Sequence, residues 1–219
     1  AKKCAEAGIT FIGPTPEMMD RVGDKINSKN VAVSAGVPVI PGSEKPIRSD
    51  EEALHFANAA GYPIMLKAAA GGGGRGMRIV REESKLLEEL HSARNEARKA
   101  FGVEDVFIEK YLEDPKHIEV QILGDSYGNI VHLYERDCSI QRRHQKLIEY
   151  TPAFSLAEEK RLEICQDAIK IASAVAYQNA GTCEFLVDQD GKHYFIEMNP
   201  RIQVEHTVTE MVTGVDIVQ

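Results

Sequence analysis

Two short apolar runs near the C-terminal end of the sequence flank the dipeptide Asp190-Gly191. Asp-Gly between such runs is typical of a β-hairpin with a two-residue turn. In that pairing, Val187 faces Tyr194, and Glu184 faces Glu197 with the two Cβ atoms about 5 Å apart. Carboxylates this close repel each other, and a divalent cation with oxygen ligands would remove the repulsion. The alternative is a pair of solvated glutamates on an exposed hairpin.

The segment that follows Glu197 alternates between polar and apolar residues, which is typical of an extended chain with two different faces. Pro200 lacks an N–H group, so we expect an edge strand or an extended loop rather than a central strand. An amphipathic edge strand is the ordinary interpretation, although a plain solvent face is more usually rich in Lys, Glu and Thr. We interpret the polar face as the floor of an active site, formed by Asn199, Arg201, Gln203 and Glu205.

Apolar periodicity, capping residues and the positions of Gly and Pro predict helices and strands over the rest of the chain. The strand at 117–123 alternates strictly, which places His117, Glu119 and Gln121 on one face. The last long helix opens at a capping box from Ser155 to Glu158. Its expected buried residues are Leu162, Cys165, Ile169, Ala172 and Ala176. The predicted helices begin at Thr15-Pro16, run from 23–25 to 36, and cover residues 49–61, 82–101 and 155–178. The predicted strands cover residues 9–12, 63–68, 77–81, 106–112, 117–123 and 130–135.

A glycine-rich loop at 71–76 joins two of the predicted strands and follows Lys67. Each glycine in regular structure costs roughly 0.5–1 kcal/mol relative to alanine, and four consecutive glycines exceed what a turn needs. Such a loop lets backbone N–H groups approach a phosphate closely. It is not a Walker A motif, because no Lys-Ser/Thr pair follows it. We predict a flexible flap over a ligand, and the alternative is a flexible linker.

The densest run of basic residues is RDCSIQRRHQK at 136–146, directly after a predicted strand. In an acidic protein such a run is a candidate anion site, and a solvated basic loop is the alternative. Lys25 lies near a predicted helix start, where the helix dipole favours anions, so it is either a phosphate-binding lysine or a solvated one. Glu109 interrupts an apolar strand at a position suited to a purine, and a plain strand edge is the alternative.

The composition is that of a globular protein, with 43% apolar and 27% charged residues in a chain of 219. The formal net charge of −8 argues against a nucleic-acid surface, because such surfaces need clustered Lys and Arg. No apolar run is long enough for a membrane helix, and the start does not resemble a signal peptide. The four scattered cysteines, without a CxxC pair, predict reduced thiols in a cytoplasmic protein. The chain begins in mid-element, so we expect a fragment of a longer protein.

Three motifs in one order resemble a known family: Lys67 with the loop 71–76, the run 136–146, and EMNPRIQVEHTVTE at 197–210. They are similar to the biotin carboxylase component of biotin-dependent carboxylases, in the ATP-grasp superfamily, over essentially the whole chain. The wording PRIQVEHTVTE is most similar to pyruvate carboxylases, whereas acetyl-CoA and propionyl-CoA carboxylases tend to read TRIQVEHPVTE. The resemblance implies an α+β ATP-grasp fold with an antiparallel-sheet core. The implied parts are the tail of an N-terminal subdomain at 1–40, a mobile lid at 41–111, and a core with the metal and bicarbonate site at 112–219.

The resemblance also implies roles for individual residues. The residues that would bind the ATP phosphates are Lys25 and Lys67, beneath the loop that contains Gly73 and Gly74. The residues that would contact adenine are Glu109, Lys110 and Leu112, and further nucleotide contacts would come from His117, Gln141 and His144. Those that would bind Mg²⁺ or Mn²⁺ are Glu184, Glu197 and Asn199. Those that would bind bicarbonate are Lys146, Arg201, Gln203 and Val204, with Glu205 as the general base.

The implied reaction is phosphorylation of bicarbonate by ATP to carboxyphosphate, which then releases CO₂ beside biotin. The sequence contains no biotin-attachment Met-Lys-Met, so biotin would come from a separate carrier domain. The other implied partner is the rest of the carboxylase polypeptide, in a homo-oligomer. The family has N-terminal and C-terminal segments that this chain lacks, so we do not expect the chain by itself to carboxylate biotin.

Two alternatives stay open at this point. Another ATP-grasp ligase, of the carbamoyl-phosphate synthetase type, would use ammonia in place of biotin, although the RRHQK run favours the carboxylase. A non-enzymatic nucleotide-binding module is the second, although its polar residues would be expected to degenerate and here they are intact.

Overall fold

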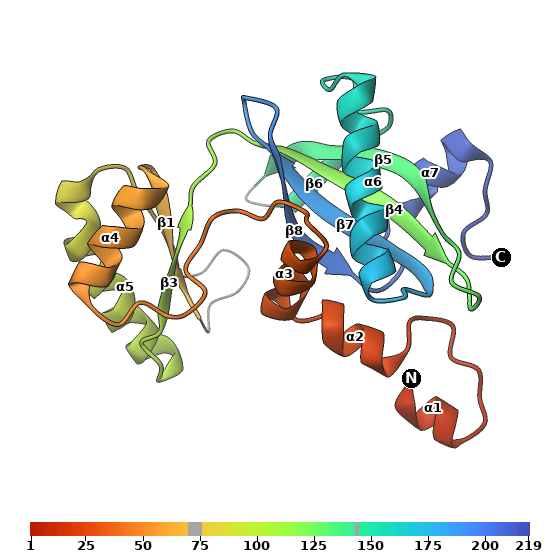
Figure 1. Cartoon of the computed structure of the whole chain (residues 1–219), viewed down its shortest axis with the longest axis horizontal. Helices are drawn as coiled ribbons and strands as arrows, with labels where there is room; N and C mark the ends of the chain where they lie inside the picture. The colour runs from red at the N-terminus through yellow and green to blue at the C-terminus, as the bar shows by residue number, and fades with distance from the viewer. Residues whose placement is uncertain (70–75, 143–144) are drawn as a thin grey trace. The chain divides into compact units, whose positions relative to one another are not determined.

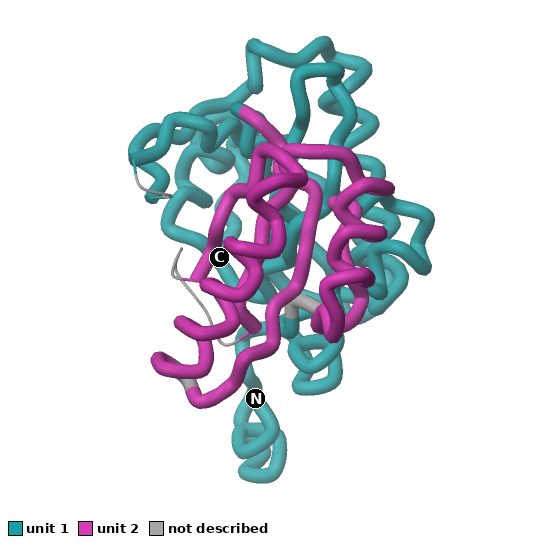
Figure 2. Tube along the Cα trace, turned by 90° about the vertical axis from the view of Figure 1, so that its left-hand side faces the viewer, with its two compact units in different colours: residues 1–39, 114–219 teal, residues 40–113 magenta. Residues whose placement is uncertain are grey.

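The structure is a computed structural model that describes residues 1–69, 76–142 and 145–219 (Figure 1), and it describes the backbone but not the side chains of residues 25, 26 and 101. The chain forms two compact units, drawn in different colours in Figure 2. Unit 1 contains residues 1–39 and 114–219, and unit 2 contains residues 40–113. Unit 2 is therefore an insertion in the chain of unit 1.

Unit 1 is built on a five-stranded sheet with the order β6-β5-β4-β7-β8, in which all neighbouring strands are antiparallel. The strands are β4 (Lys116–Gly124), β5 (Ile130–Arg142), β6 (Gln145–Tyr150), β7 (Asn179–Val187) and β8 (His193–Asn199). The helices of this unit are α1 (Lys2–Glu6), α2 (Pro16–Val22), α3 (Lys25–Ser34), α6 (Glu158–Ala174) and α7 (His206–Thr213).

The two faces of this sheet differ in polarity because side chains alternate along each strand. Ile118, Val120 and Ile122 of β4 are buried in an apolar core together with α6, which crosses the sheet in Figure 1. The residues between them point to the opposite face and are polar. On that face, Thr209 of α7 accepts a hydrogen bond from Arg136 of β5. The apolar face stabilises the unit, and the polar face carries the groups that can do chemistry.

Unit 2 contains a three-stranded antiparallel sheet with the order β2-β1-β3. Its elements are α4 (Asp50–Ala60), β1 (Ile64–Ala68), β2 (Met77–Val80), α5 (Glu83–Phe101) and β3 (Val106–Lys110). The predicted start of α4 is confirmed, because the Ser49 hydroxyl accepts a hydrogen bond from the Glu52 N–H at 3.1 Å. The predicted end of α5 is also confirmed, at Gly102, whose φ of 74° suits glycine.

The strand predicted at 9–12 is wrong: these residues form no regular structure, and Ile12 is 86% exposed. A run of so few apolar residues does not distinguish a strand from a loop. The strand predicted at 130–135 is too short, since β5 continues to Arg142 between two paired neighbours. The described part of the basic run 136–146 therefore lies in β5 and β6 rather than in a loop.

The predicted capping box of α6 is also wrong. The Ser155 hydroxyl donates to an Asp137 carboxylate oxygen at 3.3 Å instead, and the helix begins at Glu158 and ends at Ala174. Among the predicted buried residues, Leu162 is 41% exposed. The buried residues of the helix are Ile164, Cys165, Asp167, Ala168, Ile171 and Ala172. The buried face is thus rotated from the predicted one, because contact with β4 and β5 decides it.

The predicted pairing of Glu184 with Glu197 is confirmed, but the predicted turn is not. Val187 pairs with His193 rather than with Tyr194, so the loop is one residue longer than expected. Between Phe195 and Glu197 the register shifts by one residue in a β-bulge. The longer turn and the bulge each move the register by one residue in opposite directions, and the two glutamates end opposite each other.

Candidate active site

Four charged residues form a row across neighbouring strands of unit 1. Arg136 of β5 pairs with Glu119 of β4, which pairs with Glu184 of β7. Glu184 in turn pairs with Glu197 of β8. Opposite residues in a sheet have Cβ atoms about 4.5–5.5 Å apart, so three consecutive carboxylates need positive charge nearby.

Lys146 of β6 supplies part of this positive charge. Its Nζ forms an ion pair with Glu119, a second with Glu184 at 3.5 Å, and a third with Glu205 at 2.8 Å. The side chain of Lys146 is 22% exposed, and that of Glu119 is fully buried. One ammonium group therefore contacts carboxylates that come from β4, from β7 and from the start of α7.

Glu184 contacts several polar side chains of the site. Its Oε2 lies 2.8 Å from Nε2 of His117, and its Oε1 accepts hydrogen bonds from Asn199 at 2.8 Å and Gln203 at 3.3 Å. Burial by itself raises the pKa of this carboxyl group. The hydrogen bond and charge of His117, the charge of Lys146 and the Gln203 amide outweigh burial and lower the pKa to about 2. Glu184 is therefore ionised at neutral pH.

Glu205 immediately precedes α7 and faces Lys146. Burial raises the pKa of its carboxyl group, but the hydrogen bond from Lys146, a backbone hydrogen bond and the charges of Lys146 and Arg136 outweigh burial and lower it. An ionised carboxylate beside an ammonium can accept a proton from a ligand while the ammonium binds the ligand's anionic oxygen. A general base must be deprotonated and within hydrogen-bond reach of the proton that it accepts, and Glu205 meets the first condition.

The sequence predictions assigned no role to Glu119 and treated Arg136 only as part of the basic run 136–146. The guanidinium of Arg136 is fully buried, and its Nη atoms donate to five side chains at 2.8–3.4 Å: Glu119, Gln121, Thr182, Gln203 and Thr209. The alternation of β4 had placed Glu119 on the polar face. Strand β5 follows β4 in the chain, but the strand predicted there ended at residue 135, so the contact of Glu119 with Arg136 was not predicted.

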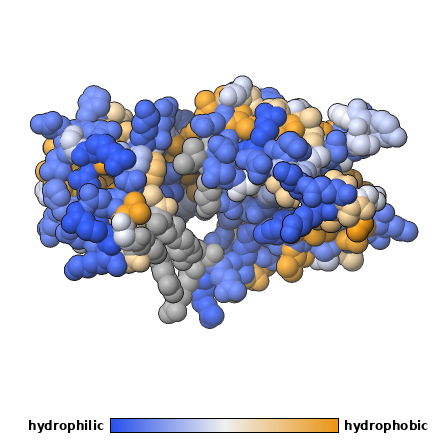
Figure 3. Space-filling model, turned by 90° about the horizontal axis from the view of Figure 1, so that it is seen from below, coloured by the Kyte–Doolittle hydropathy of each residue, from blue (hydrophilic) through white to orange (hydrophobic). Residues whose placement is uncertain are grey.

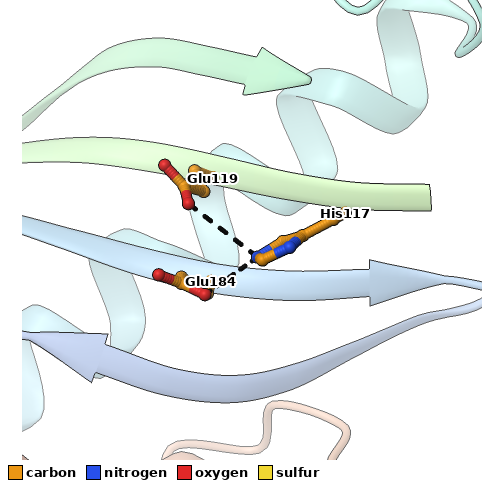
Figure 4. Close-up of side chains that lie close together, drawn as sticks. All are labelled: His117, Glu119 and Glu184. Carbon is orange, nitrogen blue, oxygen red and sulfur yellow. Dashed lines mark hydrogen bonds and ion pairs between the residues drawn. The ribbon is translucent and has the colours of Figure 1, made fainter. Parts of the chain in front are cut away.

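The side chains of His117 and Glu119, both on β4, point toward Glu184 of β7 (Figure 4). Their candidate ligand atoms lie within 4.8 Å of one another. Gln141 approaches Nδ1 of His117 at 2.8 Å from β5. Imidazole is a ligand of Zn, Cu, Fe and Ni, whereas Mg²⁺ and Mn²⁺ prefer oxygen ligands. This trio is therefore a poor match for Mg²⁺, and Glu119 is already paired with Lys146 and Arg136.

The predicted set of Glu184, Glu197 and Asn199 offers only oxygen ligands and fits Mg²⁺ better. The two glutamates are opposite each other on neighbouring strands, and the Asn199 side chain contacts Glu184. The Glu184 carboxylate now accepts hydrogen bonds from neutral amides, which a cation can displace. Their role as metal ligands stays a prediction.

The polar residues after Glu197 do not form one extended face. Strand β8 ends at Asn199, and residues 200–205 form a loop that leads into α7. Gln203 is buried, whereas Val204 is 90% exposed. Arg201 is exposed and donates to the carbonyl of the next residue at 3.1 Å and to Asn199 Oδ1 at 3.4 Å. The structure thus brings Gln203 into contact with Glu184, while Arg201 and Val204 face solvent.

Unit 2 contains several residues that were predicted to contact the nucleotide. Lys67 forms an ion pair with Glu109. The Lys110 ammonium donates to the carbonyls of Gly61 and Tyr62 at 3.0 and 3.2 Å. Leu112 follows β3. The predicted residues that lie outside the described part of the structure are Gly73, Gly74, His144 and the side chain of Lys25.

Unit 2 also contains a cavity of about 260 Å³, lined by Ile47, Arg48, His91, Arg94, Asn95, Arg98, Glu104 and Asp105. None of these is a predicted site residue. Arg48 pairs with Asp105 and Arg98 pairs with Glu104, so these cations are already neutralised. Polar residues predominate on the face drawn in Figure 3, and apolar residues occur there in small groups.

Residues 24–219 match the protein family described as the carbamoyl-phosphate synthase L chain, ATP binding domain. The chain belongs to this family. A pyruvate carboxylase from Staphylococcus aureus is 57% identical over 219 residues, which are 100% of this chain and 19% of the relative.

Two solved structures of biotin carboxylases have the same fold as this chain. Biotin carboxylase from Campylobacter jejuni, in a complex described as β-γ-ATP, is 54% identical with a TM-score of 0.87, over 99% of this chain and 49% of that one. The biotin carboxylase domain of 2-oxoglutarate carboxylase from Hydrogenobacter thermophilus, in complex with MgADP, ADP and bicarbonate, is 56% identical with a TM-score of 0.85. That match covers 100% of this chain and 48% of the other. The predicted α+β ATP-grasp fold is confirmed.

The chain spans about a fifth of the length of the curated relatives, since it matches 18–19% of each, and about half of these two solved chains. Among the residues that the structure describes, none of the helices is long and apolar enough to cross a membrane.

Proposed function

We propose that this chain is the ATP-binding part of a biotin carboxylase, which uses ATP and bicarbonate to carboxylate biotin on a carrier domain. The observation that carries the proposal is the position of Lys146. Its ammonium lies between Glu184, at the predicted metal site, and Glu205, the predicted general base. The relative with bound MgADP and bicarbonate supports the same assignment.

In this reaction, bicarbonate attacks the γ-phosphoryl group of ATP and ADP leaves. The carboxyphosphate that results breaks at its C–O bond to CO₂ and inorganic phosphate beside biotin. Lys146 binds the bicarbonate anion, and Glu205, whose lowered pKa keeps it ionised, accepts the bicarbonate proton. Gln203 supplies an amide N–H from the same wall. Arg201 now donates to two neutral oxygens, which an anion can replace, and its planar guanidinium suits carboxylate-like oxygens.

Mg²⁺ or Mn²⁺, when bound, would neutralise charge on the transferring phosphoryl group. The residues that would hold it are Glu184, Glu197 and Asn199. The geometry supports this: Glu184 and Glu197 are opposite each other on neighbouring strands and offer carboxylate oxygens, and Asn199 contacts Glu184.

We also propose that residues 41–111 are a lid over the nucleotide, that 112–219 are the core, and that 1–40 are the tail of a preceding subdomain. The separate compact unit at 40–113 supports the lid. In the lid, Lys67 would exchange Glu109 for a phosphate group, beneath the loop that contains Gly73 and Gly74. The other proposed nucleotide contacts are Lys25, Glu109, Lys110, Leu112, His117, Gln141 and His144, and Val204 would flank the bicarbonate.

We favour pyruvate as the final acceptor, because the pyruvate carboxylases are 54–57% identical to this chain. The domain from 2-oxoglutarate carboxylase is 56% identical, so identity alone does not select the acceptor. An acyl-CoA carboxylase and an ammonia-dependent ligase of the carbamoyl-phosphate synthetase type are the alternatives. The remaining proposals are a homo-oligomer with the rest of the polypeptide and a reducing, cytoplasmic location, in keeping with the free thiols of Cys138, Cys165 and Cys183.

The test is ATP hydrolysis by the full-length parent protein with bicarbonate, in the presence of biotin or of ammonia. We expect biotin to stimulate hydrolysis, and stimulation by ammonia alone would refute the proposal. Glu205→Gln should lower kcat on the order of 10²-fold, because loss of a general base has effects of at least that size. Lys170→Met is the matched control, since Lys170 pairs with Asp167 on α6, away from the site. Pyruvate, 2-oxoglutarate and acetyl-CoA as third substrates then identify the acceptor.

A further inference from the structure

We propose that Arg136 is a positioning residue of this site, which orients the bicarbonate-binding groups without touching a substrate. The inference rests on the proposed function. The guanidinium of Arg136 is 0% exposed, so a ligand on the surface of the site has no access to it. Its hydrogen-bond partners come from four separate segments: β4, β7, the loop 200–205 and α7.

Arg136 fixes the orientation of the Gln203 amide. Gln203 Oε1 accepts a hydrogen bond from Arg136 at 3.2 Å, and its Nε2 donates to Glu184 at 3.3 Å. If the amide turned over, its NH₂ group would face a guanidinium and its oxygen would face a carboxylate, and both contacts would be repulsive. The hydrogen bond from the fork of Arg136 therefore determines which end of Gln203 is presented to the site.

Arg136 also limits how strongly Glu119 attracts Lys146. Oε2 of Glu119 accepts from Arg136 at 3.3 Å, while its Oε1 pairs with Lys146. The same ammonium must remain 2.8 Å from Glu205 to bind an anion beside the general base. Without Arg136, Glu119 would keep Lys146 as its close partner and His117 at 3.8 Å, and it would draw Lys146 away from Glu205.

The third contact connects Arg136 to α7. Nη1 of Arg136 donates at 2.8 Å to Thr209, which is 1% exposed. Glu205 immediately precedes this short helix, so the position of Thr209 sets the position of the general base. Arg136 thereby connects the bicarbonate-binding loop and α7 to the sheet.

Stability by itself does not account for a guanidinium at this place. Its Nε is buried and has no hydrogen-bond partner among the described residues. A buried donor without a partner destabilises the fold, and well-packed apolar residues often replace buried ion pairs without loss of stability. Three of the contacts made by the Nη atoms instead lead to the site: those to Glu119, to Gln203 and to Thr209 of α7.

The test uses the full-length carboxylase with the change Arg136→Lys, which retains the charge but removes the planar fork. Bicarbonate-dependent ATP hydrolysis gives kcat and the KM values for bicarbonate and for ATP. We expect KM for bicarbonate to rise on the order of tenfold, while KM for ATP changes by less than about twofold. The matched control is Arg161→Lys. Arg161 pairs with buried Glu135, the neighbour of Arg136 on the other face of β5, and both KM values should stay unchanged.

A second comparison distinguishes positioning from simple structural support. If Arg136 acts through Gln203, Arg136→Lys should add little to KM for bicarbonate in a Gln203→Ala background. A lower kcat with unchanged KM values, equal rises in both KM values, or additive effects in the double variant would each overturn the inference.

Should Arg136→Lys fail to fold, Thr209→Val removes one acceptor, and Thr209→Ser keeps the hydroxyl. We expect KM for bicarbonate to rise in the first and to return toward normal in the second, and no change in Thr209→Val overturns the inference. An unmodified enzyme without bicarbonate-dependent hydrolysis refutes the proposed function and this inference with it. If the unmodified enzyme shows bicarbonate-dependent ATP hydrolysis and the Arg136 and Thr209 variants have the same KM for bicarbonate, only the inference about Arg136 is refuted.

Discussion

Replacement of Lys146 by methionine is the most direct test of the site's electrostatics. Methionine retains much of the aliphatic volume but removes the ammonium that contacts Glu119, Glu184 and Glu205. Glu119 is 0% exposed, and the side chains of Glu184 and Glu205 are 9% and 12% exposed. The variant therefore leaves three poorly solvated carboxylates with less positive charge.

The expected loss of stability follows from these contacts. Breaking a buried ion pair by removing one partner costs about 3–5 kcal/mol. Glu119 keeps Arg136 and Glu184 keeps His117, and Lys146 itself is 22% exposed, so we expect the lower end of that range. A loss of about 3 kcal/mol corresponds to roughly a hundredfold change in the folding equilibrium.

The assay is urea denaturation of the purified protein in metal-free buffer. Lys170→Met is the control, because its ammonium is paired with Asp167 but its side chain is 55% exposed, and such pairs contribute about 0–1 kcal/mol. Added Mg²⁺ should restore part of the stability of Lys146→Met and stabilise the unmodified protein less, since the cation neutralises the same carboxylates. A loss equal to that of the control, or no difference in the response to Mg²⁺, would refute this account of the site.

Three further predictions concern folding and pH. Phe195→Ala should lower the free energy of unfolding by about 3–5 kcal/mol, because this ring is fully buried and its centroid lies 5.8 Å from that of Phe185. A loss below about 1 kcal/mol, measured by urea denaturation, would contradict this packing. Ser49→Ala should cost about 1 kcal/mol and increase hydrogen exchange in the first turn of α4, and unchanged exchange would argue against the cap. Because the folded-state pKa of Glu205 is lowered, its contribution to stability is complete above its ordinary pKa of 4.5 and is lost as the pH falls through the folded value. Thermal unfolding between about pH 7 and about pH 3 should therefore show a weaker acid dependence in Glu205→Gln, and identical profiles would contradict this assignment.

Much of the local structure could be predicted from short stretches of sequence. Ser49 and Thr15 accept hydrogen bonds at the starts of α4 and α2, as their positions before a helical pattern predicted. The alternation of β4 predicted that Glu119 shares a face with His117. These features follow from interactions within a few residues, so local propensity is sufficient to determine them.

Other local predictions failed where a distant group competed with the local one. Ser155 matched a capping box, but its hydroxyl donates to Asp137 of β5 instead of capping α6. The buried face of α6 likewise depends on its contact with β4 and β5, so Leu162 is exposed although the periodicity placed it inside.

The candidate site divides in the same way. The sequence by itself determined the facing pair of Glu184 and Glu197, although a longer turn and a bulge produce the pairing in place of a two-residue turn. Only the tertiary structure brought Glu184 beside Glu119 and Lys146 between Glu184 and Glu205. Hairpin pairing is set by a few neighbouring residues. The order of strands in a sheet depends on burial of the whole apolar face, which no short segment encodes.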